Sequence, residues 1–298
     1  MTTKLRREIN AIIDNCIKTQ ATTLDLGNCD LRTFRQCTKL WECTHIDTLI
    51  LDCFPYNRES IYNTKNNYGP NHLVDLEGIQ QLPQLKKLLL RSQHHQQEYR
   101  DLVDIAPLAA LTSLQHLDIS GNSIIDISPL SKLVKLEYLN LHTNNITNIW
   151  PLEKLTQLRQ LSLSNNRIVD IYPLLGLTNL TALDFQLNQV RDISPIVNLL
   201  QLETLDLANN QIKDISILRT LTKLKNLNIQ NTLVGDISAL EKLTDLVNLN
   251  LQNNKVADIT VLSKLKKLET LDLSRNKISS LLPLAELSSL HSLFTDDE

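Results

Sequence analysis

Leucine recurs in this chain at a fixed interval of 22 residues. One column of leucines runs from Leu114 to Leu290 without a gap, and a second runs three positions later, from Leu117 to Leu293. A strict period of this length indicates stacked structural repeats, each burying its apolar side against its neighbours. The repeats account for the abundance of leucine, which makes up 61 of the 298 residues.

The other columns predict a short strand and two turns in each repeat. Alternating leucines in the L-x-x-L-x-L segment fit a strand of a parallel sheet with one face in the core. An asparagine column follows the strand, from Asn122 to Asn210, where its amide can bond turn backbone that stacking buries. Next comes a segment such as Asp126-Ile127-Ser128-Pro129-Leu130, in which Asp bonds nearby backbone and Pro fixes φ. The bulkier turn side predicts a curved stack with its sheet on the concave face.

The repeat pattern LxxLxLxxNxIxDIxPLxxLxx resembles the 22-residue class of leucine-rich repeats, above all the internalin-type repeat of bacteria. The resemblance is close over residues 114–293 and continues less regularly back to about residue 21. A phosphatase-1 regulatory subunit of animals and fungi uses a similar unit. The resemblance implies an α/β leucine-rich repeat solenoid, horseshoe-shaped, with a parallel concave sheet and a convex side of short 3-10 or extended segments.

The two ends of the repeat array differ. Residues 1–20 predict an N-terminal capping helix, because Leu5, Ile9 and Ile13 fall on one helical stripe. Residues 21–298 then form about eleven repeats, in one structural domain with the cap. The last strand, around Leu293, is followed only by polar and mostly acidic residues, so its edge is open to self-association or to further chain.

Cysteine placement favours reduced thiols. All five cysteines lie within the first 53 residues, their number is odd, and no C-x-x-C motif occurs. Cys29 and Cys37 fall on core columns of the repeat. We therefore favour buried thiols over a disulfide-bonded cap, and the spacing does not fit a zinc site.

Charge and hydropathy exclude several classes of function. A net charge of −3 provides no basic footprint for nucleic acid, and no apolar run approaches the length of a membrane span. No secretory signal is visible at the start of the chain. These features predict a cytoplasmic protein, with export by a route that needs no signal peptide as the alternative.

Catalytic motifs are missing from the sequence. G-x-G-x-x-G, Walker A, G-x-S-x-G and H-E-x-x-H patterns do not occur. Asp184 and Asp206 are expected to lie side by side on adjacent strands, but on an open sheet that favours a solvated surface. We therefore predict no enzyme, no cofactor and no metal site.

Two early repeats carry insertions, near residues 54–72 and 92–102. Leu51 and Asp75 are separated by 24 residues where a regular repeat has seven, and Leu90 and Asp104 by 14. Both insertions follow the strand, so they are expected to emerge side by side, and they hold five of the twelve aromatic residues. Tyrosine favours interfaces. Binding to a partner and packing of the loops on each other remain open alternatives.

The predicted concave face has an apolar spot beside these insertions. Its central column is polar except at Ile50 and Leu89, which belong to the two interrupted repeats. The predicted partner-binding residues are Ile50, Phe54, Tyr56, Tyr62, Tyr68, Lys87, Leu89, Arg91, Tyr99, His116, Tyr138 and His142. The sequence thus predicts a non-enzymatic module that binds a protein partner. The alternatives are a phosphatase-type regulatory subunit, the sensor half of a larger enzyme, and a host-directed effector or adhesin.

Overall fold

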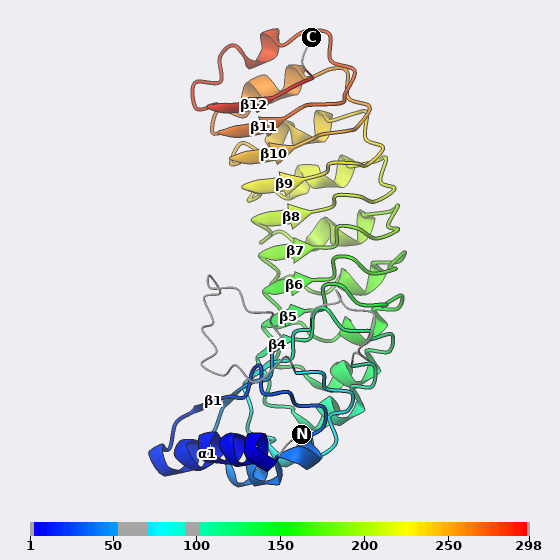
Figure 1. Cartoon of the computed structure of the whole chain (residues 1–298). Helices are drawn as coiled ribbons and strands as arrows, with labels where there is room; N and C mark the ends of the chain where they lie inside the picture. The colour runs from blue at the N-terminus through cyan, green and yellow to red at the C-terminus, as the bar shows by residue number, and fades with distance from the viewer. Residues whose placement is uncertain (1–2, 53–70, 93–101, 297–298) are drawn as a thin grey trace. The chain divides into compact units, whose positions relative to one another are not determined.

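The computed structural model describes residues 3–52, 71–92 and 102–296. The chain divides into two compact units, residues 1–158 and 159–298, and each is described by itself. In both units, short strands and 3-10 turns alternate along the chain, except that two turns follow each other within residues 34–42, between the first two strands (Figure 1).

The first unit contains one α-helix, five strands and six 3-10 turns in its described residues. Helix α1 spans Thr3–Thr19. The strands are β1 (Thr23–Asp25), β2 (Thr48–Ile50), β3 (Lys87–Leu89), β4 (His116–Asp118) and β5 (Tyr138–Asn140). The 3-10 turns are η1 (Phe34–Gln36), η2 (Thr38–Glu42), η3 (Ile79–Gln81), η4 (Ala106–Ala110), η5 (Ser128–Lys132) and η6 (Trp150–Leu152).

The second unit contains seven strands and six 3-10 turns in its described residues. Its strands are β6 (Gln160–Ser162), β7 (Ala182–Asp184), β8 (Thr204–Asp206), β9 (Asn226–Asn228), β10 (Asn248–Asn250), β11 (Thr270–Asp272) and β12 (Ser292–Phe294). The 3-10 turns are η7 (Tyr172–Leu174), η8 (Ser194–Asn198), η9 (Ser216–Thr220), η10 (Ser238–Lys242), η11 (Thr260–Lys264) and η12 (Leu282–Leu284).

Within each unit the strands form a parallel sheet in chain order. Every strand pairs residue for residue with the next, so that Leu117 lies opposite Leu139 and Leu227 opposite Leu249. The middle residue of each strand, always leucine, is buried everywhere except at Leu293 in the last strand. With the 3-10 turns opposite the sheet, this arrangement confirms the predicted leucine-rich repeat fold.

Helix α1 covers the first layer of the core, as predicted. It buries Leu5, Ile9, Ile13 and Cys16 and packs against β1 and η2. Asp14 on its exposed side forms an ion pair with Lys39 of η2, at 2.7 Å. Over the described residues, no helix has the length and apolar content that crossing a bilayer requires.

The Asp-Ile-x-Pro-Leu segment initiates the 3-10 turns. In η5, the backbone N–H of Ser128 donates to Asp126 Oδ1 at 2.8 Å, and Pro129 occupies the second position of the turn. The same bond recurs from Ser194 to Asp192 in η8 and from Thr260 to Asp258 in η11. Asp therefore holds the first turn of the segment, and Pro loses no needed donor there.

The asparagine column forms a ladder that joins successive turns. Asn144 Nδ2 donates to the carbonyls of Ile119 and Leu141, both at 3.1 Å, while its Oδ1 accepts the N–H of Ile124 at 3.0 Å. One buried amide therefore satisfies backbone of its own turn and of the preceding one. The ladder positions of regular repeats are Asn122, Asn144, Asn166, Asn188, Asn210, Thr232, Asn254 and Asn276.

The cysteines of the described residues are free and buried, at positions 16, 29, 37 and 43, as predicted. Burial raises the pKa of both Cys29 and Cys37 to about 12, so these thiols stay protonated and unreactive at neutral pH. Cys53 lies outside the described residues.

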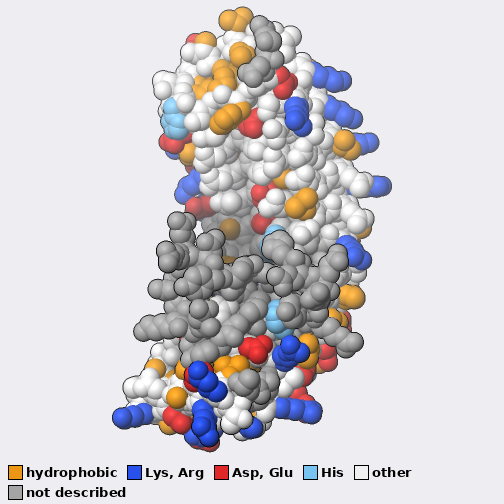
Figure 2. Space-filling model, in the orientation of Figure 1, with side chains coloured by type: hydrophobic (Ala, Val, Ile, Leu, Met, Phe, Trp, Pro, Cys, Tyr) orange, Lys and Arg blue, Asp and Glu red, His pale blue; other side chains and the backbone are white. Residues whose placement is uncertain are grey.

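The last repeat leaves part of its core columns exposed. Leu281 and Leu293 have exposed fractions of 42% and 41%. The outward-facing ring of Phe294 is 55% exposed beside them, and hydrophobic side chains gather at this C-terminal end of the second unit (Figure 2). The leucine equivalent to Leu293 in each preceding repeat is at most 3% exposed.

A second column, three residues after the end of the strand, adopts left-handed backbone. It has φ of +52° to +56° at Asn28, Thr143, Asn165, Leu187, Asn209, Asn231, Asn253 and Arg275. Asparagine tolerates this conformation better than other side chains, because it can bond locally. Three of these asparagines are also linked in a row, since Asn253 donates to Asn231 at 2.7 Å and Asn231 to Asn209 at 3.0 Å.

Leu187 is the apolar exception in this column, with φ +55° and an exposed fraction of 46%. Replacing it by asparagine relieves a strained backbone and extends the row that ends at Asn209. We expect Leu187→Asn to stabilise the protein by about 1 kcal/mol, measured as the free energy of unfolding in urea. Leu187→Ala removes the same apolar surface without either gain, so equal stabilities of the two variants would contradict the explanation.

Candidate interaction surface

The outward face of the sheet carries the first and third residues of each strand, because the middle leucine points into the core. In the first unit the first positions of β3, β4 and β5 align Lys87 with His116 and Tyr138. The third positions of β2, β3 and β4 align Ile50 with Leu89 and Asp118. The predicted residues Ile50, Lys87, Leu89, His116 and Tyr138 therefore lie in two rows on four adjacent strands, β2 to β5.

A carboxylate or amide at the third strand position normally closes the following turn. Its oxygen accepts the backbone N–H two residues later, for example from Ser120 to Asp118 at 3.1 Å and from His142 to Asn140 at 3.0 Å. The same bond occurs at Asp25, Asp184, Asp206, Asn228, Asn250 and Asp272. This column therefore has a structural role in addition to facing outward.

Leu89 cannot accept that N–H, and Asp52 of the preceding repeat does so instead. The backbone N–H of Arg91 donates to Asp52 Oδ1 at 3.0 Å. The guanidinium of Arg91 binds the second oxygen, Oδ2, through Nη2 at 2.5 Å and Nε at 3.1 Å. The Asp52 side chain is fully buried, and that of Arg91 is 20% exposed. Such a charge-assisted, two-pronged contact is among the stronger polar interactions in proteins.

Asp118 completes a three-residue charge cluster, the Asp52–Arg91–Asp118 cluster. Its Oδ2 lies 3.9 Å from Arg91 Nε and accepts the Asn140 amide at 3.1 Å. Burial raises the pKa of Asp118, and its hydrogen bonds with Ser120, together with the charge of Arg91, partly offset that rise. The cluster joins β4 to the two segments that follow β2 and β3.

His116 and Tyr138 form an aromatic pair beside this cluster. Their rings are parallel within 2°, with centroids 3.9 Å apart. Burial, followed by the positive charges of Lys87 and Arg91, lowers the pKa of His116 to about 4. The imidazole is therefore neutral at physiological pH and presents a flat, uncharged ring.

The predicted apolar spot is only partly present. Ile50 is half-buried, but Leu89 has an exposed fraction of 2% and offers almost no surface to a partner. Asp52 closes the turn after β3, so position 89 needs no side-chain acceptor and can carry an apolar residue. His142 is exposed but follows β5 on the turn, separate from the row of Lys87, His116 and Tyr138. Phe54, Tyr56, Tyr62, Tyr68 and Tyr99 lie outside the described residues.

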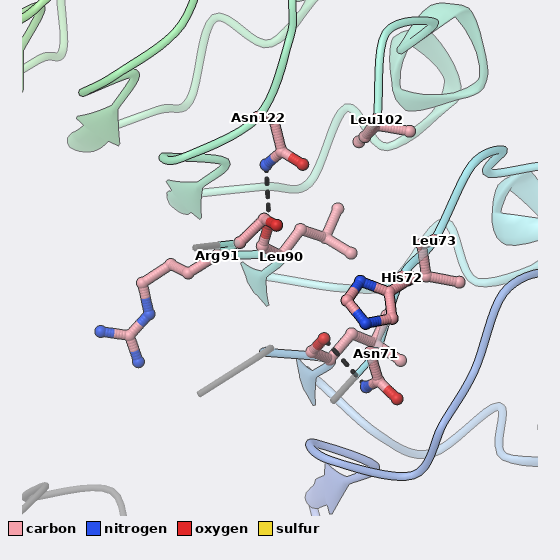
Figure 3. Close-up of a pocket in the computed structure, with 9 residues that line it drawn as sticks. Asn71, His72, Leu73, Leu90, Arg91, Leu102 and Asn122 are labelled. Carbon is pink, nitrogen blue, oxygen red and sulfur yellow. Dashed lines mark hydrogen bonds between the residues drawn. The ribbon is translucent and has the colours of Figure 1, made fainter. Parts of the chain in front are cut away.

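The chain re-enters the repeat after the first insertion at Asn71. Asn71 Oδ1 accepts the N–H groups of Cys29 and Leu31, at 3.0 and 2.9 Å, and its Nδ2 donates to Leu26 and Leu51. Asn71 therefore occupies the ladder position of its repeat, and Asn122 donates in the same way to Leu90 at 3.0 Å. Figure 3 shows both amides around a cavity of about 10 Å³, with Arg91 pointing away from it. This cavity is too small for a ligand.

Gly121 permits a close approach next to the second insertion. Its φ is +71°, and a Cβ atom there would lie 1.9 Å from the carbonyl oxygen of Ser92. Only glycine fits such a contact without moving the backbone. Together with the N–H of Ser92, which donates to Ser120 at 2.9 Å, this contact fixes the point where the second insertion starts.

Sequence reasoning did not single out Asp52 and Asn71, although both left a signal. Asp52 follows a strand whose successor lacks the usual Asp or Asn, so a replacement acceptor was needed nearby. In a regular repeat the ladder asparagine follows the leucine after the strand by three residues, as Asn144 follows Leu141. Asn71 follows Leu51 by 20 residues, which is three plus the length of the insertion. Counting backwards from the next repeat would have found it.

The described residues contain no group of three or more His, Cys, Asp or Glu side chains positioned to hold a metal ion. Asp184 and Asp206 do lie opposite each other in β7 and β8. Burial raises the pKa of Asp206, and the negative charge of Asp184 adds to that rise. Each carboxylate also accepts the N–H that closes its own turn, at 3.0 and 2.9 Å, so both are structural.

Comparison with known proteins places these features in a family. A family model described as leucine-rich repeats (2 copies) matches residues 112–154, 156–198, 200–242 and 243–293, more than half of the chain. The chain belongs to the leucine-rich repeat family. No curated protein matches it significantly in sequence.

Solved structures with similar folds include several internalins of Listeria monocytogenes. One internalin (inlF) is 28% identical, with a TM-score of 0.74 over 99% of this chain and 96% of its own. Internalin C2 (inlC2) is 34% identical, with a TM-score of 0.61 over 63% of this chain and 83% of its own. The functional domain of InlJ, which includes a cysteine ladder, shares the fold at 21% identity, with a TM-score of 0.71 over 92% of this chain and 53% of its own. The repeats are thus internalin-like and bacterial, as the resemblance implied.

Removing the Asp52 carboxylate leaves the mostly buried guanidinium of Arg91 without the carboxylate that it binds. We expect Asp52→Ala to lower the free energy of unfolding by about 3 kcal/mol, because the Arg91 N–H and side chain both lose their acceptor. The exposed Lys225–Glu203 pair, at 2.8 Å, is the control, and breaking it by Glu203→Gln should cost less than about 1 kcal/mol. Similar losses in urea unfolding for both variants would show that the cluster is not a structural anchor.

His116 makes stability depend on mildly acidic pH. Its pKa is lower in the folded protein than in the unfolded chain, so the unfolded chain binds a proton first. The His116 contribution to stability is therefore present above pH 6.5 and is lost as the pH falls toward about 4. In urea unfolding at several pH values, the stability of the wild type relative to His116→Gln should fall over this range. A constant difference would contradict the pKa shift.

Proposed function

We propose that the chain is a non-enzymatic recognition module that binds a protein partner through the outward face of its first unit and the two adjacent insertions. The observation that carries the proposal is the Asp52–Arg91–Asp118 cluster. It fixes the residues from which the two insertions depart, directly beside the His116–Tyr138 pair.

Pre-organisation supports this use of the surface. Asp52 is the last described residue before the first insertion, and Arg91 is one residue from the last before the second. A charge-assisted contact between them holds both ends of chain in place before any partner arrives. Fixing such segments in advance reduces the ordering cost of binding.

The side chains of this face fit protein recognition. Tyr138 and the neutral His116 offer stacked rings with polar edges, and Lys87 lies next to them in register. Aromatic groups of this kind contribute strongly to interfaces because they bury much area with few rotatable bonds. The insertions add Phe54, Tyr56, Tyr62, Tyr68 and Tyr99, which lie outside the described residues and are proposed here on their composition alone.

The family is consistent with binding rather than catalysis. Leucine-rich repeat domains bind protein partners in general, and internalin-like proteins are generally non-enzymatic. The carboxylates that sequence reasoning considered for acid–base chemistry are occupied in closing turns. We therefore favour a binding module over the sensor half of an enzyme.

Quantitative affinity capture tests the proposal. The immobilised wild-type chain is compared with a triple variant, Lys87→Ala with His116→Ala and Tyr138→Ala, in lysates of bacterial and host cells. We expect the triple variant to lose at least about tenfold in recovery of the partner, as is typical for central interface residues. Gln160→Ala is the control, because Gln160 also occupies a first strand position and is exposed.

A loop exchange tests the insertions separately. Residues 54–70 are replaced by a short Gly-Asn turn that keeps Asn71, since deleting Asn71 would break the ladder for a structural reason. Loss of capture with unchanged thermal unfolding supports binding by the loop. Full capture by both the triple variant and the loop exchange would overturn the proposed function.

A further inference from the structure

The outward face of the second unit carries a shallow groove unrelated to the surface proposed above. It has a volume of about 320 Å³ and crosses the five strands from β8 to β12. Most of its lining side chains are polar. The exceptions are the ring of Phe294 and the buried leucines Leu205, Leu227 and Leu249. The polar lining residues are Thr204, Asp206, Asn226, Asn228, Asn248, Asn250, Thr270 and Asp272.

The first strand positions form one hydrogen-bonded row along this groove. Asn248 Nδ2 donates to Asn226 Oδ1 at 2.7 Å, and Asn226 Nδ2 donates to Thr204 Oγ1 at 3.3 Å. The amides are therefore held in one orientation, with each NH2 group directed toward the preceding strand. Asn248 Oδ1 receives no hydrogen bond from the described residues and remains available as an acceptor.

The third strand positions form a second, parallel row. Asn228 donates to Asp206 Oδ2 at 3.0 Å, and Asn250 donates to Gln230 Oε1 at 3.2 Å. Asp272 uses its Oδ1 to bind Ser274, whereas its Oδ2 has no donor among the described residues. The groove thus presents amide and carboxylate groups whose orientation is set before a ligand binds.

An exposed aromatic ring closes one end of the groove. Phe294 lies opposite Asp272 in the register of β11 and β12, and its exposed fraction is 55%. It is the only aromatic lining residue. A half-exposed ring at the end of two polar rows gives an apolar platform next to fixed hydrogen-bonding groups.

We propose that this groove binds a neutral oligosaccharide. Sugar hydroxyls donate and accept hydrogen bonds, which matches side chains that offer amide NH2, amide oxygen and carboxylate oxygen together. The C–H face of a sugar ring packs well on an aromatic ring such as that of Phe294. Adjacent strands lie about 4.8 Å apart, close to the rise per sugar of an extended β-linked chain, so successive sugars can meet equivalent side chains.

Other ligand classes fit the groove less well. No lysine or arginine lines it, and two carboxylates do, so anionic ligands such as nucleic acid or acidic glycans are disfavoured. Phe294 is the one exposed apolar side chain of the lining, because the lining leucines are buried, and this gives a protein partner few of the anchors that interfaces use. The backbone hydrogen-bonding groups of β8 to β11 are already used within the sheet, so a peptide cannot add a strand across these four strands of the groove.

Binding of defined glycans to the whole chain tests this proposal. An array of neutral hexasaccharides of glucose, mannose, galactose and N-acetylglucosamine is compared with acidic hexasaccharides, and calorimetry follows on the strongest binders. We expect a neutral glycan to bind, and Asn248→Ala and Phe294→Ala each to weaken it about tenfold, the effect of losing a hydrogen bond or ring contact. Both side chains are exposed, so thermal unfolding should not change.

Gln160→Ala again serves as the control, because it removes an exposed amide at the same strand position outside the groove. It should leave glycan affinity unchanged. The proposal is overturned if no neutral glycan binds at millimolar concentration, if acidic glycans bind better, or if the two groove variants bind as the wild type does. Displacement of the glycan by an extended peptide with higher affinity would likewise assign the groove to peptides.

Discussion

In the described repeats, the turn after the strand buries backbone groups that a ladder side chain satisfies in its own repeat and in the preceding one. A buried N–H or C=O without a partner costs as much as a lost hydrogen bond, and stacking removes the turns from water. The ladder amide answers this constraint with three bonds from one side chain, as Asn144 does with Ile119, Leu141 and Ile124. The leucine core provides the apolar burial, but the ladder fixes how one repeat sits on the next.

The charge cluster obeys the same rule where the repeat is irregular. Leu89 has no side-chain oxygen to close the turn after β3, so the backbone N–H of Arg91 needs another acceptor. Asp52 provides the oxygen, and because it is fully buried it also requires a positive charge. The guanidinium of Arg91 meets that need. A backbone requirement thus explains an ion pair that would otherwise be read only as a binding feature.

The sequence predicted the fold well and the candidate surface less well. The strand positions, the 3-10 turns that begin within Asp-Ile-x-Pro-Leu, the cap helix and the buried thiols follow from columns in which each residue type has one physical role. Leu89 was misjudged because alternation assigns it to the outward face but says nothing about what covers that face. Asp52 was missed because its partner lies 39 positions away and its role arises only from an acceptor that another repeat lacks.

The contacts of Asn71 restore the geometry of the repeat after the first insertion, whatever the length of that insertion. The chain leaves the repeat after Asp52 and regains it when one amide reaches the carbonyls of Leu26 and Leu51. Since the entropy of closing a loop rises only slowly with its length, the intervening segment can be long or short at similar cost. Segments of different length and composition can therefore be inserted between Asp52 and Asn71, because the contacts of these two residues hold the repeats on either side in place.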